Sequence, residues 1–185
     1  MEGKKKAGYE YLLAYKLTVA IYDLTDQFVE RFIDKYSRTR DQMTQAARSG
    51  MQNIVEGNRQ QGLSGYIKLS GVARGSLEEL LKDYFSLARQ KKLEIFAKEK
   101  VLGEIGEIRE IWKILNASKA LPDIPNFPNI PKSPEKAVNL MITLIKQATY
   151  LLDKLIISLK EKHMKEGGLT EELYRKRIEY RKNNP

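Results

Sequence analysis

Residues 48–80 read RSGMQNIVEGNRQQGLSGYIKLSGVARGSLEEL, and this stretch decides the fold. Apolar and small residues recur in it every three or four positions, which predicts two amphipathic helices joined by a short turn. Gly50, Gly71 and Gly75 fall inside these patterns, where each glycine costs about 1 kcal/mol relative to alanine. We therefore expect these glycines to let one helix approach another closely. Small residues beside them are Ala46, Ala47, Ser70 and Ala73.

A long amphipathic helix is predicted ahead of this stretch, from about Tyr9 to Tyr36. Its apolar positions are Leu13, Leu17, Ile21, Leu24, Phe28 and Phe32. A T-x-x-Q capping box at Thr39–Gln42 predicts the start of the second helix. Gly57 or Gly62 supplies a left-handed stop for that helix.

The third helix is predicted to start at Ser64, which is a good N-cap residue. Its apolar seam alternates four and three residues apart without a break, as a helical bundle requires. The seam residues are Tyr66, Ser70, Ala73, Leu77, Leu80, Tyr84 and Leu87. A weaker fourth helix, from about Lys98 to Leu115, contains Gly103 and Gly106.

Proline recurs every third residue from position 122 to position 134. Polyproline II also has three residues per turn, so residues 121–134 are predicted to form an extended strap with one apolar edge, Ile124, Phe127 and Ile130. At about 3.1 Å per residue the strap spans roughly 37 Å, enough to carry the chain along a bundle. We expect the apolar edge to pack on this protein or a neighbouring subunit. The alternative is a PxxP ligand for an aromatic groove.

The last long helix is predicted to begin with Ser133 as cap and Pro134 at its first position, and to end at Gly167–Gly168. Its seam is Val138, Met141, Ile145, Ala148, Leu152, Leu155 and Leu159. Thr170 is expected to cap a short final helix. The predicted fold is all-α. An antiparallel up-down four-helix bundle occupies residues 8–165, with an extra short helix and the strap, and a basic C-terminal helix and tail follow at 168–185.

The chain has 185 residues, a net charge of +9 and no cysteine. This length suits one domain. A positive surface attracts nucleic acid, an acidic protein or an anionic membrane, and it is also typical of a merely solvated exterior. Without cysteine there are no disulfides, thiolate metal sites or cysteine nucleophiles. With no long apolar segment and no signal-peptide core, we expect a cytoplasmic protein that does not enter membranes.

Residues suited to catalysis are scarce. The single histidine, His163, has no ligand-spaced partners and is expected to be solvated near a helix end. Glu78–Glu79 and Glu171–Glu172 are adjacent pairs that point to different sides of a helix, so neither forms a carboxylate dyad. We therefore predict no enzymatic activity, no cofactor and no metal site.

Nucleic acid is one partner compatible with the charge, whose sign alone does not choose among the three. The candidate contacts gather in the last helix, at Arg175, Lys176, Arg177, Arg181 and Lys182. A second candidate set lies on the third helix, at Lys68, Lys82, Arg89, Lys91 and Lys92. No base-reading motif or aromatic stacking platform is evident, so slight sequence preference is expected, for RNA or DNA.

The segments RSGMQNIVEG (residues 48–57) and ARGSLEELLKDY (residues 73–84) carry a family resemblance. Together they resemble the bacterial four helix bundle protein family. That family includes the protein encoded by intervening sequences in 23S ribosomal RNA and the accessory variability determinant of diversity-generating retroelements. The resemblance extends from about Gly8 to the end, and Asn139–Arg177 looks like the C-terminal helix and suffix of one branch.

The resemblance implies a homo-oligomer, since similar members form pentameric rings. It also implies a scaffold that binds nucleic acid and a protein, as the retroelement accessory protein does with its reverse transcriptase. The alternative is a purely structural or ribosomal-RNA-associated protein. The family motif contains no known catalytic residue, so its polar positions transfer only a packing pattern. We expect an interhelical ion pair or hydrogen-bond network of Glu56 and Arg74, and the alternative is a functional surface. The polar positions of the motif are Arg48, Asn53, Glu56, Arg74 and Glu78.

Overall fold

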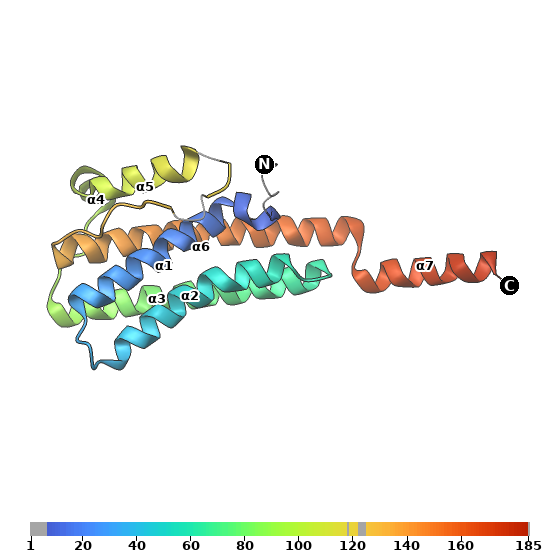
Figure 1. Ribbon diagram of the computed structural model, residues 1–185, viewed down its shortest axis with the longest axis horizontal. Helices are drawn as coiled ribbons and strands as arrows, with labels where there is room; N and C mark the ends of the chain where they lie inside the picture. Colours follow the sequence, from blue (N-terminus) through green and yellow to red (C-terminus); the bar gives the residue numbers. More distant parts are fainter. Residues whose placement is uncertain (1–6, 118, 122–124, 185) are drawn as a thin grey trace, which may run out of the picture.

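The computed structural model describes residues 7–117, 119–121 and 125–184, and these contain helices but no strand. Four long helices form an up-down bundle (Figure 1). They are α1 (Leu13–Phe32), α2 (Arg38–Asn58), α3 (Leu63–Lys91) and α6 (Pro134–Glu166), and the 3-10 turn η1 (Gly8–Tyr11) precedes them. The predicted all-α bundle is confirmed. Within the described ranges, no helix is both long and apolar enough to cross a bilayer.

Two short helices, α4 (Lys98–Glu104) and α5 (Gly106–Ala117), lie outside the bundle against α1 and α6 (Figure 1). The sequence predicted one helix here. The helix breaks at Ile105, whose backbone leaves the helical region at φ −115° and ψ 86°. Ile105 itself is buried at this break. The change of direction also lets the second helix turn its apolar face inward.

The two predicted seams form the core. All seven seam residues of α3 are buried, and so are those of α6 except Leu155, which is half-buried. The rings of Tyr84 and Phe28 meet edge to face at 4.9 Å. The Tyr84 hydroxyl lies 3.3 Å from Thr25 Oγ1, which satisfies this polar group inside the core. Burial raises the pKa of Tyr84, because the charged phenolate is poorly solvated there.

The close approach of α2 and α3 depends on Gly50, as predicted, and on Gly57, for which a helix stop was predicted instead. A Cβ added at Gly50 would lie 2.7 Å from Leu77 Cδ2, and one added at Gly57 would lie 2.7 Å from Tyr66 Cδ2. The prediction for Gly71 and Gly75 is wrong. Nothing lies within 4 Å of a Cβ added at either position, because both glycines face outward from α3.

Most of the predicted helix ends are displaced. Ser37 caps α2 by accepting a hydrogen bond from the Thr39 amide, so α2 starts earlier than the predicted capping box. Ser64 and Thr170 lie inside α3 and α7 (Leu169–Asn183), which begin after Gly62 and Gly168.

The predicted stops also differ from the structure. Helix α1 ends at Phe32, short of Tyr36. Gly57 lies within α2, and Gly62 is extended at φ −135°, so neither glycine is left-handed. The two positive φ values among the described residues belong to Lys92 and Gly167. Gly167 does end α6, and Ser133 with Pro134 does begin it, as predicted.

The described part of the strap, residues 125–133, runs back along the bundle to the start of α6 (Figure 1). Ile130 is 2% exposed and Phe127 packs against the core, so the apolar edge faces this chain as predicted, while Ile124 lies outside the described residues. Gln27 Oε1 accepts from the Ile130 amide at 2.9 Å. Arg31 donates to the Ile130 carbonyl at 2.8 Å, which fastens the strap to α1.

Candidate nucleic-acid interface

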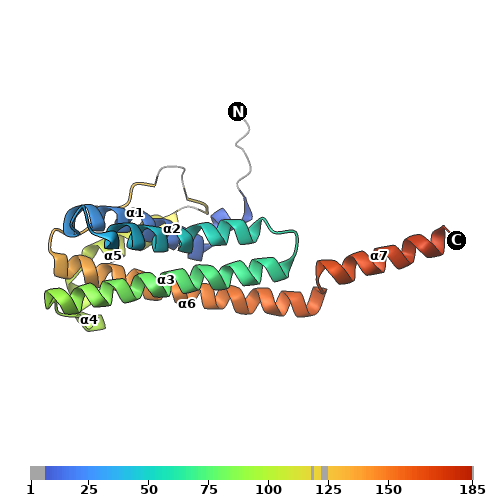
Figure 2. The same ribbon diagram turned by 90° about the horizontal axis from the view of Figure 1, so that it is seen from below.

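Helix α7 projects beyond the end of the bundle, as both ribbon views show (Figures 1 and 2). None of its described residues is buried. The chain turns at Gly167, where φ is 78°, and the Glu171 carboxylate accepts from the Gly168 amide to cap the helix. The helix is therefore fixed at its first turn and open to solvent along its length.

The five basic residues of α7 surround the helix axis. Arg175 and Lys182 are seven residues apart and share one face, while Arg177 and Arg181 are four apart and share another. All five are exposed. Lys176 donates to Glu172 at 2.5 Å, and this hydrogen bond lowers the pKa of the Glu172 carboxyl. The other four cations form no ion pair within the described part of the chain.

Two exposed tyrosines lie among these cations. Tyr174 and Tyr180 are exposed, and Tyr174 shares a face with Arg177 and Arg181 because they follow it at three and seven residues. An exposed ring flanked by arginines can stack on a nucleic-acid base while the arginines contact phosphates. The expectation of no aromatic stacking platform overlooked these two exposed rings, whose helical spacing from the arginines is readable in the sequence.

His163 lies in the last turn of α6, as expected, at the joint with α7, and it is half-buried, so its ring is only partly solvated. Its Nδ1 atom is buried without a hydrogen-bond partner among the described residues. The ring packs so closely against Gly168 that a Cβ there would lie 3.0 Å from His163 Cε1. No group of three metal-ligating side chains occurs in the described ranges.

The second basic set is not gathered into one patch with α7. Lys68, Lys82 and Arg89 lie on the exposed outer face of α3, spread over about 31 Å at 1.5 Å per residue. Lys91 donates to the Phe32 carbonyl at 3.2 Å and so caps the end of α1. Lys92 is the left-handed residue that ends α3.

The two ends of α3 lie far apart on the molecule. Leu169 lies beside Gly62, so α7 leaves the bundle next to the start of α3. Lys91 and Lys92 therefore lie at the end of the bundle remote from α7 (Figure 1).

The polar residues of the motif make different contacts from those expected. Arg74 Nε donates to Asp153 of α6 at 2.6 Å, and Arg74 Nη2 lies 3.8 Å from Glu78 Oε1. The Asp153 hydrogen bond raises the pKa of the Arg74 guanidinium. The predicted Glu56–Arg74 pair is wrong, because Glu56 is exposed on α2 while Arg74 turns toward α6.

Asn53 does join α2 to α3, through two serines. Its amide donates to Ser49 Oγ at 3.0 Å, and Ser49 Oγ lies 2.8 Å from Ser76 Oγ on α3. Arg48 is exposed on the outer face of α2. Over the described part of the chain, neither Arg48 nor Glu56 forms an ion pair.

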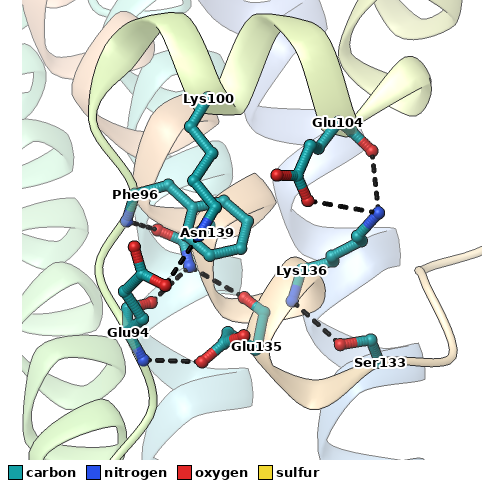
Figure 3. Close-up of polar contacts among 8 residues, drawn as sticks. All are labelled: Glu94, Phe96, Lys100, Glu104, Ser133, Glu135, Lys136 and Asn139. Carbon is teal, nitrogen blue, oxygen red and sulfur yellow. Dashed lines mark hydrogen bonds and ion pairs between the residues drawn. The ribbon is translucent and has the colours of Figure 1, made fainter.

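Asn139 anchors a polar clamp that the sequence did not reveal (Figure 3). This side chain of α6 is 1% exposed. Its Oδ1 accepts from the Phe96 amide at 2.8 Å, and its Nδ2 donates to the carbonyls of Glu94 and Glu135 at 2.8 and 2.9 Å. The side chain of Glu135 accepts from the Glu94 amide at 2.7 Å.

Two lysines complete the clamp. Lys100 pairs with Glu94 at 2.6 Å, and Lys136 lies 3.5 Å from Glu104 (Figure 3). Together these contacts hold the α3–α4 connection and α4 against the start of α6. The clamp is structural, because its buried groups bond one another and leave no donor or acceptor of Asn139 open to a ligand.

Comparison with known proteins gives one result. Residues 10–117 match the family described as 23S rRNA-intervening sequence protein. This chain belongs to that family. No curated protein and no solved structure matches it.

The match to the 23S rRNA-intervening sequence protein family spans α1 to α5. It includes the glycine-bearing contact of α2 with α3, whose residues first indicated the resemblance. The strap, α6 and α7 lie outside the matched range. The basic helix is therefore a feature of this chain that the family match does not explain.

Proposed function

We propose that this chain is a non-enzymatic, cytoplasmic helical scaffold that binds nucleic acid through α7 and holds a protein partner. One observation carries the proposal. Helix α7 has no buried described residue, yet it carries five cations and two exposed tyrosines. An isolated helix of this length is marginal in water, so contact with another molecule favours its formation.

The arrangement of cations on α7 suits backbone recognition. Arginines and lysines on several faces can contact phosphates of one strand or of both strands of a duplex. Tyr174 and Tyr180 add stacking surfaces that accept any base. Neither contact reads a base edge, so sequence preference is slight and affinity depends strongly on salt.

A salt titration of binding tests this proposal. The probes are a short fluorescently labelled RNA and a DNA duplex of equal length. For the variant with Arg175, Lys176, Arg177, Arg181 and Lys182 changed to Gln, each lost phosphate contact lowers the log–log salt slope by about 0.7–0.9. The matched control changes Lys68, Lys82, Arg89, Lys91 and Lys92 to Gln and keeps the wild-type slope. Equal slopes for wild type and the α7 variant refute the role of α7.

A second candidate function is a purely structural or ribosomal-RNA-associated role, which the family's description as 23S rRNA-intervening sequence protein favours. The location of the gene separates the two. A reverse transcriptase gene and template repeat beside it support the scaffold, with that enzyme as the protein partner. A position inside a 23S ribosomal RNA gene supports the alternative.

Self-assembly is part of the proposal. The outward glycines Gly71 and Gly75 flank Val72, which is also exposed, so this face of α3 permits close approach of another subunit. The resemblance implies a pentameric ring. A ring would repeat α7 around its axis and strengthen nucleic-acid binding through multivalency.

A further inference from the structure

An apolar groove of about 530 Å³ lies where α4 and α5 pack against the outer face of α6. This volume is typical of a binding site, and apolar and aromatic side chains predominate in the walls. The chief apolar residues are Phe96, Leu102, Trp112, Ile142, Tyr150 and Leu151. Leu102 and Tyr150 are exposed at the rim, so the groove is open to a partner.

Hydrogen bonds hold both walls of the groove. On one side, Asn139 fixes Phe96 through its backbone amide (Figure 3). On the other side, Trp112 Nε1 donates to Gln147 Oε1 at 2.9 Å, which ties α5 to α6. A preformed groove loses little conformational entropy when a partner enters it, and this favours binding.

The groove continues into an apolar stripe along α6. Tyr150, Ile157 and Met164 recur every seven residues, and their exposed fractions are 60%, 51% and 77%. Residues seven apart lie on one face of a helix, and the positions between these three on that face are charged, so the stripe offers one apolar anchor every two turns. The stripe extends about 21 Å at 1.5 Å per residue, which suits a helix lying along α6 better than a compact small molecule.

Three lysines flank the groove and the stripe. Lys98 and Lys146 line the groove, while Lys146 lies 5.3 Å from the centre of the Phe85 ring and Lys154 lies 5.5 Å from that of Tyr150. None of the three forms an ion pair within the described residues. Asp153, on the same helix, is neutralised by Arg74. Glu161 is exposed between Ile157 and Met164, so the unpaired positive charge lies beside the groove and beside the stripe as far as Ile157.

We infer that the groove and stripe bind an acidic amphipathic helix of another protein. Apolar anchors of that helix fill the groove and cover Tyr150, Ile157 and Met164, while its carboxylates meet Lys98, Lys146 and Lys154. A second copy is a poorer occupant, since pairing two identical stripes would bring like charges together. The inference rests on the proposed function only for its protein partner, and it does not depend on nucleic-acid binding.

A displayed peptide library tests the inference with the full chain as bait. Each library member is a tryptophan-free amphipathic helix with apolar seam positions and with Glu or Lys at the flanking positions. Selection on the wild type, with counter-selection on Ile157→Glu, is expected to recover peptides rich in Glu. Recovery of no peptide, or of peptides rich in Lys, overturns the inference.

The single tryptophan of the chain, Trp112, reports the binding directly. The strongest acidic peptide is expected to change Trp112 fluorescence saturably. Ile157→Glu should weaken binding at least about tenfold, as loss of an interface anchor does. The double variant Lys146→Glu with Lys154→Glu should lower the affinity for the acidic peptide by a similar factor and raise the affinity for a lysine-rich version of that peptide.

Two controls make the outcome specific. Tyr36→Glu adds a charge at an exposed apolar residue in the α1–α2 turn and should bind the peptide like the wild type. The five-glutamine variant of α7 should lose RNA binding and keep peptide binding, so failure of one proposal is distinguished from failure of the other. If Ile157→Glu instead dissolves a homo-oligomer in which the peptide cannot bind, a second copy occupies the stripe and the inference is wrong.

Discussion

At the scale of single residues, the helix-internal glycines divide into two kinds. Gly50 lies under Leu77 with no room for a side chain, whereas Gly71 has open space around it. From the sequence, both glycines were predicted to lie in the same helix contact, because a glycine within a helical pattern indicates close approach without identifying the neighbouring helix. Only the rotation of α3 about its axis decides which glycine faces α2, and that rotation follows from the buried seam of Leu77 and Tyr84.

Gly50→Leu should therefore destabilise the fold, by about 1–3 kcal/mol, because the added side chain overpacks the contact with Leu77. The matched change Gly71→Leu should leave the free energy of unfolding unchanged or raise it by up to about 1 kcal/mol through helix propensity. Urea titrations at two protein concentrations measure both variants and remove any contribution from assembly. Equal losses for the two variants would show that Gly71 is also packed.

Asp83 supplies a prediction of pH dependence. Burial first, and the nearby Glu79 second, raise the pKa of the Asp83 carboxyl above its ordinary value near 3.8. A raised pKa in the folded state means that stability is highest below the unfolded value and falls as pH rises through the folded value.

Asp83→Asn should therefore raise the free energy of unfolding at pH 7 more than at pH 3, where the carboxyl is protonated in both states. Glu79→Gln removes the charge beside Asp83 but leaves Asp83 buried, so it should raise the free energy of unfolding at pH 7 by less. Urea titrations at the two pH values measure the difference. A gain for Asp83→Asn that is the same at both pH values would contradict this origin.

At the scale of helices and strap, periodicity predicted the faces well and the ends poorly. The seams of α3 and α6, apart from the half-buried Leu155, and Ile130 of the strap are buried where expected, because a repeat reports which side of an element meets the core. Helix ends depend on which of several nearby residues acts as the cap, and at the start of α2 the N-cap is Ser37 and not Thr39. The groove beside Trp112 joins residues from α4, α5 and α6, so no local pattern indicates it.

The strap gives a test of packing at this scale. Phe127→Ser together with Ile130→Ser should lower the free energy of unfolding, by about 1.5–3 kcal/mol for each fully buried large apolar side chain and by less for the half-buried Phe127. The matched control changes Asn126 and Asn129, which are exposed on another edge, to Ser and should be silent. A silent Phe127 and Ile130 variant would make the strap a free linker and would favour the PxxP alternative.

Helix α7 should be dispensable for the bundle, because none of its described residues is buried. A chain ending at Glu166 is expected to keep the wild-type midpoint of thermal unfolding and to lose most of its RNA affinity. Circular dichroism and the same labelled RNA measure the two effects. A clear drop in the midpoint would contradict this prediction, because it would show that contacts of α7 stabilise the bundle.

At the scale of the whole molecule, the outward glycine face of α3 and the apolar stripe of α6 are separate surfaces that a solitary subunit leaves exposed. The first presents open space at Gly71 and Gly75, with Lys68 and Lys82 on the same face of α3, and the second carries the flanking lysines Lys146 and Lys154. The close approach that these glycines permit supports the proposed self-assembly through α3, and the apolar groove beside the stripe supports the proposed foreign partner at α6. A sequence alone cannot separate them, since both consist of exposed residues on helices whose other faces form the core.

Native mass spectrometry should accordingly detect a closed homo-oligomer of the 21.3 kDa chain, with five subunits as the resemblance implies. Gly71→Leu should release monomers while preserving the stability of each subunit, because the added side chain separates the neighbouring surfaces without touching α2. Ile157→Glu should leave the oligomer intact. A wild-type chain that stays monomeric at micromolar concentration would refute assembly, and dissociation by Ile157→Glu alone would move the subunit contact to α6.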